Sequence, residues 1–127
     1  MSKETAVRFG VPLVFVATLA ILFAVIVTSP VGSCLFPPST FDAQAWQSAD
    51  PTRWCNARAA MAEDLMSHEL TVGMARADVR ALLGDPDTED PAIPTSFYWV
   101  FCQIDCDSVA IRYDANGRVA EVSEYQD

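Results

Sequence analysis

The sequence is poor in basic residues and contains a single histidine. Among its 127 residues, eight Lys and Arg stand against 17 Asp and Glu, for a formal net charge of -9. Nucleic-acid binding requires a basic surface, so this balance excludes it. The one histidine, His68, has no second histidine to share a metal site, and we interpret it as a surface partner of Asp64 four residues earlier. We therefore predict no catalytic, cofactor-binding or metal-binding residues, no cofactor, and a protein that is not an enzyme.

Charged residues are also missing from a long N-terminal stretch. The 21 residues Phe9–Ser29 are uncharged and mostly apolar, and as a helix they would rise about 31 Å, close to the roughly 30 Å hydrocarbon core of a bilayer. We therefore predict a transmembrane helix. Lys3 and Arg8 precede it, which predicts a cytoplasmic N-terminus and an extracytoplasmic domain, periplasmic in a Gram-negative cell.

A second form of membrane attachment competes with the spanning helix. The run Val31-Gly32-Ser33-Cys34 resembles the lipobox of bacterial lipoproteins, in which the cysteine is lipidated. Under this alternative the protein would be an outer-membrane lipoprotein anchored through Cys34.

All four cysteines follow the apolar stretch, which places them in a compartment where disulfides persist. Four cysteines allow three pairings, and the sequence does not choose among them. Cys102 and Cys106 flank a short turn between two expected strands, so a hairpin would bring them within disulfide reach. Cys34 and Cys55 are the candidates for a second bond. A C-x3-C pair without further soft ligands does not indicate a metal site.

The chain beyond the anchor divides by composition. Residues 34–50 contain Pro37-Pro38 and are interpreted as a linker. Asp50-Pro51 predicts the start of a helix that runs to about His68. A second helix is expected over Met74–Leu83, where Gly84 ends it.

The C-terminal half of the domain is predicted to be a sheet. The acidic, proline-rich residues 85–96 are expected to form an exposed loop. Strands are predicted over Phe97–Cys102, around Val109–Tyr113 and over Val119–Tyr125, with Asn116-Gly117 as a hairpin turn. The predicted fold is α+β: a membrane anchor within residues 1–33, a linker over 34–50, and a two-layer domain over 51–127. In this domain two helices pack on a three-stranded antiparallel meander.

A stretch of this domain resembles a known family. Residues 73–86 follow the pattern G-M-x4-V-x2-L-L-G-x-P, and the aromatic strand Phe97-Tyr98-Trp99 and the turn Tyr113-Asp114-Ala-Asn-Gly117 come after it. Over about residues 70–122 the sequence is similar to the SmpA/OmlA, or BamE-like, family of bacterial cell-envelope proteins. The resemblance implies a two-helix, three-stranded fold tethered to the envelope. It also implies a binding scaffold, since the best-known members belong to the outer-membrane β-barrel assembly machinery.

These observations predict a membrane-tethered, extracytoplasmic protein-interaction module of the bacterial envelope, with a scaffold role in outer-membrane protein assembly. Its partners would be the membrane and an unidentified envelope protein, with no nucleic acid. The alternative is an inhibitor or ligand-binding domain that acts on a secreted or envelope enzyme. The expected binding surface is an exposed aromatic patch formed by Tyr98, Trp99 and Tyr125.

Overall fold

The computed structural model describes residues 14–25 and 32–127. The chain forms two compact units, Met1–Phe36 and Pro37–Asp127. In the first unit, residues 14–25 are helical and α2 (Gly32–Leu35) is a single turn.

The predicted transmembrane helix over Phe9–Ser29 is wrong. Within the described residues, no helix has both the length and the apolar character needed to cross a bilayer. Residues 9–13 and 26–29 of the predicted span lie outside the described residues. The predicted membrane-anchored localisation depended on that span, so the same finding contradicts it. Lys3 and Arg8, used to orient the span, lie outside the described residues.

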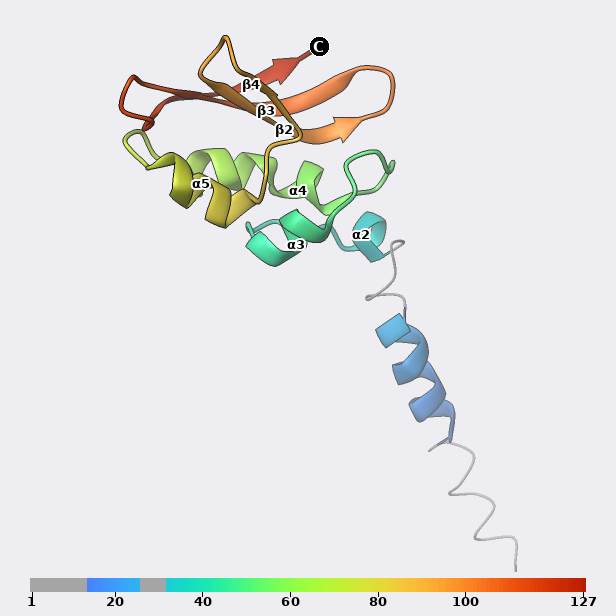
Figure 1. The fold of residues 1–127 in the computed structure, drawn as a ribbon. Helices are drawn as coiled ribbons and strands as arrows, with labels where there is room; N and C mark the ends of the chain where they lie inside the picture. The colour runs from blue at the N-terminus through green and yellow to red at the C-terminus, as the bar shows by residue number, and fades with distance from the viewer. Residues whose placement is uncertain (1–13, 26–31) are drawn as a thin grey trace, which may run out of the picture. The chain divides into compact units, whose positions relative to one another are not determined.

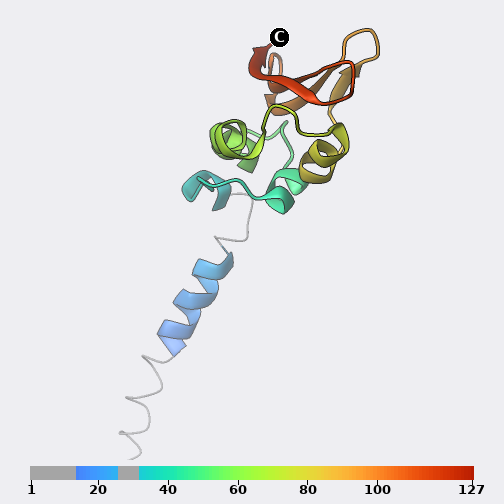
Figure 2. The same ribbon diagram turned by 90° about the vertical axis from the view of Figure 1, so that its left-hand side faces the viewer.

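The second unit is an α+β domain in two layers (Figures 1 and 2). Helices α3 (Ala43–Ser48), α4 (Ala57–Asp64) and α5 (Arg76–Leu83) lie on one side of the sheet, and a π-helical turn η1 (Leu65–Glu69) extends α4. The sheet is an antiparallel meander in the order β1-β2-β3-β4. Its strands are β1 (Thr88–Asp90), β2 (Thr95–Cys102), β3 (Cys106–Tyr113) and β4 (Val119–Gln126).

The sheet therefore has four strands, where the sequence predicted three. The additional strand β1 lies inside the acidic segment 85–96 and pairs with β2, with Thr88 opposite Phe97. All three of its residues are exposed. A three-residue exposed strand carries no alternation of apolar and polar side chains, so this segment has the composition of a loop.

Residues 37–50 of the segment interpreted as a linker lie in the second unit. The Asp42 side chain accepts a hydrogen bond from Ala45 N at 2.7 Å and caps α3. Trp46 on this helix is fully buried. A helix of six residues is too short to show an apolar period, which explains why composition alone suggested a linker.

The next helix begins later than predicted. Asn56, not Asp50, is its N-cap and accepts from Ala59 N at 3.2 Å. Asp50 instead accepts hydrogen bonds from the backbone and hydroxyl of Thr52, at 3.0 and 2.6 Å, and so stabilises a turn. Trp54 therefore lies outside the helix and is 77% exposed. Asp-Pro is a turn signal as well as a helix-start signal, and here the turn forms.

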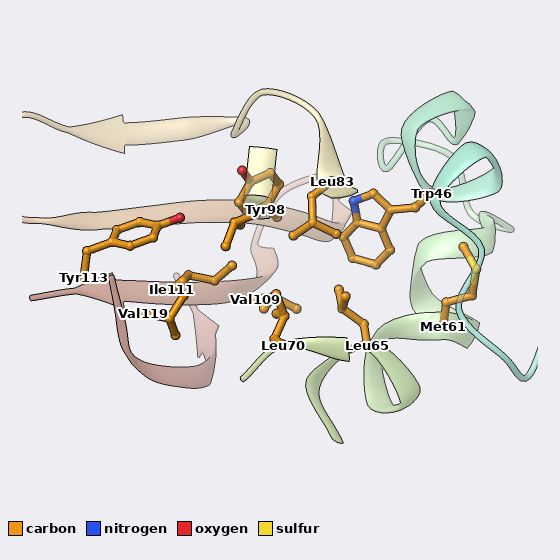
Figure 3. Packing of buried hydrophobic residues seen from close by; sticks show 11 residues of the cluster. Trp46, Met61, Leu65, Leu70, Leu83, Tyr98, Val109, Ile111, Tyr113 and Val119 are labelled. Carbon is orange, nitrogen blue, oxygen red and sulfur yellow. The ribbon is translucent and has the colours of Figure 1, made fainter. Parts of the chain in front are cut away.

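The core lies between the helices and the inner face of the sheet. Figure 3 shows Trp46 reaching from α3 toward Leu83, in a cluster to which every strand except β1 contributes. The buried hydrophobic residues of this cluster are Trp46, Met61, Leu65, Leu70, Val79, Leu83, Tyr98, Val109, Ile111, Tyr113 and Val119.

One charged side chain, Arg58 on α4, lies within this apolar interior. Its side chain is 8% exposed and pairs with Asp87 at 2.8 Å. Its Nε donates to Trp46 O at 3.0 Å, and its Nη1 also donates to Trp99 O at 3.0 Å. The guanidinium carbon lies 5.1 Å from the centre of the Trp46 ring. Arg58 therefore joins α3, α4, the segment before β1, and β2.

We expect Arg58→Ala to lower the free energy of unfolding by about 3–5 kcal/mol, because it leaves Asp87 and two carbonyl groups without their partner in a largely buried site. Urea denaturation followed by tryptophan fluorescence measures this change. The control is Arg112→Ala, whose pair with Glu121 is 52% and 59% exposed and should contribute about 0–1 kcal/mol. Equal effects of the two substitutions would contradict this role of Arg58.

Candidate interaction surface

The helices cover one face of the sheet, and the described residues leave the opposite face uncovered (Figure 2). Side chains alternate between the two faces along each strand. In β2, Ser96 and Tyr98 point to the helices and are buried. Phe97 and Trp99 therefore point to the uncovered face, which we call the open face.

Three aromatic side chains cluster on the open face. Trp99, Ser108 and Tyr125 lie side by side on β2, β3 and β4. The rings of Phe97 and Tyr125 are 5.2 Å apart between centres, in a tilted arrangement. Tyr125 remains 46% exposed, whereas the small residues between the rings, Ser108 and Ala110, are 5% and 8% exposed. The small residues allow the large rings to approach one another across the middle strand.

Tyr98, expected in this patch, is not part of it. It is fully buried on the inner face, and its hydroxyl donates to Gly84 O at 3.1 Å. Burial raises the pKa of the Tyr98 hydroxyl, so the group stays protonated and keeps this hydrogen bond. Phe97, which the sequence analysis left out, takes its place. The sequence Phe97-Tyr98-Trp99 could have predicted this exchange. Neighbouring residues of a strand point to opposite faces, so Phe97 and Trp99 share one face and Tyr98 lies on the other.

The backbone N–H and carbonyl of Trp99 are both hydrogen-bonded to side chains. Trp99 N donates to Asp87 Oδ2 at 2.9 Å, and Trp99 O accepts from Arg58 at 3.0 Å. The pairing of β2 with β3 shifts register just after Trp99, between Trp99 and Phe101. Such a bulge changes the direction of the strand. The buried ion pair thus fixes the point where the strand bends and positions Trp99.

The hairpin that carries the open face is closed by a disulfide. Cys102 and Cys106 are bonded, with Cα atoms 4.1 Å apart, as the hairpin geometry predicted. Each of the other two cysteines is in a disulfide as well, so none of the four is free. Two disulfides are consistent with a secreted or otherwise oxidising compartment.

The acidic residues before β2 act mainly as partners of arginines. Asp87 binds Arg58, while Glu89 binds both Arg76 and Arg80 on α5 and accepts from the Ser96 hydroxyl. Within the described part of the chain, no group of three or more His, Cys, Asp or Glu side chains is arranged to hold a metal ion.

His68 and Asp64 form the pair expected from their spacing, with His68 Nδ1 2.8 Å from Asp64 Oδ1. The other carboxylate oxygen accepts from Phe41 N at 2.7 Å. The hydrogen bond from Phe41 and the interaction with His68 lower the pKa of Asp64. Phe41 packs on Trp46, with ring centres 6.0 Å apart. This geometry fastens the segment before α3 to the end of α4.

The sequence matches no model of a known protein family and no curated protein sequence. The resemblance of residues 70–122 to the SmpA/OmlA family therefore stays a prediction, and the function of the open face rests on its own geometry.

Asp64→Asn should reduce stability at neutral pH. A carboxyl whose pKa is lowered by folding stabilises the native state above its ordinary pKa, and this contribution is lost as the pH falls. The difference in unfolding free energy between wild type and variant should thus be largest above about pH 5 and shrink toward pH 2. Urea titrations across this range measure it. A difference that stays constant with pH would show that the carboxylate charge contributes nothing.

Proposed function

We propose that this protein is a protein-interaction module of the bacterial cell envelope, not an enzyme, and that its open face docks an envelope partner. The observation that carries the proposal is the cluster of Phe97, Trp99 and Tyr125 on a sheet face that the described residues leave uncovered. Phe, Trp and Tyr are among the residues enriched in protein interfaces.

The shape of the open face favours a protein over a small molecule. Small-molecule sites are concave and enclose most of their ligand. The aromatic rings here lie on a sheet with small residues between them. None of the helices α3, α4 and α5 lies on this face (Figure 2). The exposed Arg112–Glu121 ion pair, with side chains 52% and 59% exposed, supplies a polar border at one end. An apolar centre with a polar border is the usual composition of a protein interface.

The open face is also preorganised. The Cys102–Cys106 disulfide closes the β2–β3 hairpin, and Arg58 with Asp87 holds the backbone at Trp99. A surface that is already ordered loses less conformational entropy on binding, which leaves more of the contact energy for affinity.

The envelope partner and the scaffold role are proposed from the resemblance to the SmpA/OmlA family. Two glycines of the shared pattern have physical roles consistent with it. Gly73 has φ +92° and Gly84 has φ +80°, values that other residues rarely adopt. Gly73 N donates to Val119 O at 2.7 Å, which joins the loop before α5 to the sheet.

Site-specific photo-cross-linking in the native organism tests the proposal. With benzoylphenylalanine in place of Trp99, we expect a discrete adduct with one envelope protein. Adding Phe97→Ala to this chain should reduce the adduct about tenfold or more, since truncating a central aromatic contact usually costs above 1.4 kcal/mol.

The matched control carries the cross-linker at Val72, which is 76% exposed and lies in the loop before α5. Adducts of equal yield from the two positions, or no adduct at Trp99, would overturn the proposal. Urea denaturation of each variant verifies that the fold is retained.

A further inference from the structure

The outer edge of β4 is paired only where the strand begins. Val119 N donates to Met74 O at 2.8 Å and Gly73 N donates to Val119 O at 2.7 Å, and Ala75 forms a bridge with Arg118. Beyond Val119, no described residue continues this pairing, since β4 is the last strand of the sheet. The remainder of the edge offers backbone groups to an added strand.

A groove runs beside this edge, between β4 and α4. Its volume is about 630 Å³. Val100 of the sheet and Met66 of η1 contribute apolar surface, with Ala59 and Ala62 from α4. Figure 2 shows β4 at the edge of the sheet on the same side of the domain as α4.

The charged side chains that line the groove are all acidic. Glu63 comes from α4, Asp107 from β3 and Glu124 from β4, and no Lys, Arg or His among the described residues lines it. None of the ion pairs among the described residues involves these three carboxylates. Those pairs are Arg53–Asp50, Arg58–Asp87, His68–Asp64, Arg76–Glu89, Arg80–Asp85, Arg80–Glu89 and Arg112–Glu121. The groove thus complements a basic ligand and repels an acidic one.

Charge also argues against a second copy of this chain as the occupant. Pairing two β4 edges would bring Glu121 and Glu124 of one copy near those of the other, and like charges on neighbouring strands are destabilising. The net charge of -9 adds to this repulsion.

We propose that the outer edge of β4 binds a basic, extended segment of a partner protein as a fifth strand. Alternate side chains of that segment enter the groove, where a Lys or Arg meets Glu63 and Glu124 and an aliphatic side chain packs on Met66. This inference rests on the proposed function, because it assumes a protein partner. The groove shares Ser108 and Tyr125 with the open face, but Phe97 and Trp99 do not line it. Strand addition supplies affinity through the backbone, and the groove supplies specificity.

Binding of a synthetic peptide to the full chain tests this inference. The probe is a fluorescent nine-residue peptide of alternating Lys and Val, measured by anisotropy at low and physiological salt. The double variant Glu63→Gln/Glu124→Gln should weaken binding about tenfold at low salt, and the loss should be smaller at higher salt because exposed charges are screened. The matched control is Glu121→Gln, since Glu121 pairs with Arg112 on the open face, and we expect less than about a twofold change.

Two peptides methylated on alternate backbone nitrogens separate strand addition from charge attraction alone. Only one set of alternate N–H groups faces the strand edge. One methylated peptide should therefore bind about as well as the parent, and the other should lose at least about tenfold. Equal binding by both peptides would overturn strand addition, and an equal loss for Glu121→Gln would show diffuse charge attraction.

Sedimentation of the chain alone tests for a second copy as occupant. A dimer that Glu124→Gln strengthens would overturn the assignment to a basic partner. Trp99→Ala separates the two proposals, because it should leave peptide binding unchanged. If the peptide does not bind while the cross-linked adduct at position 99 still forms, strand addition is refuted and the open-face proposal stands. If the peptide binds but no adduct forms at position 99, only the open-face proposal is refuted.

Discussion

The domain depends on one buried cation. Arg58 is almost removed from solvent, and its nitrogens reach the end of α3, the segment before β1 and the middle of β2. A buried guanidinium is costly unless its hydrogen bonds are satisfied, so the elements around it must keep their relative positions. Arg58 and its partner Asp87 also bond to the backbone of Trp99, whose side chain lies on the opposite side of the sheet. The stability of the fold and the geometry of the open face therefore both depend on Arg58.

Sequence patterns predicted the sheet well where local signals were strong. The aromatic, β-branched run around Tyr98, the alternation from Val109 to Tyr113 and the Asn116-Gly117 turn each specify a strand or hairpin without help from distant residues. Helix α5 was also located, because Gly84 ends it. Short elements were missed. Helix α3 and strand β1 are stabilised by tertiary partners, Trp46 in the core and the edge of β2, which no local period reveals.

The remaining errors came from signals that have two physical meanings. Asp50-Pro51 is a turn signal as well as a helix-start signal, and the turn is what forms. The candidate site shows the same ambiguity. Tyr98 and Trp99 are equally aromatic, yet strand alternation sends one into the core and the other to the open face. The acidic segment looked like a solvated loop because its arginine partners, Arg58 and Arg76, are distant in sequence.

The two unpaired surfaces of the sheet follow from its topology. A meander covered by helices on one side leaves its other face open, and its last strand keeps a free edge unless a loop covers it. Among the described residues, the loop at Gly73 pairs with the start of β4 and none pairs with the rest of its outer edge. Glu121 and Glu124 then have two consequences. Their charges disfavour pairing with another acidic edge, which protects the chain from association with itself, and they leave the edge open to a strand of opposite charge. The same two carboxylates thus disfavour self-association and favour a basic partner strand.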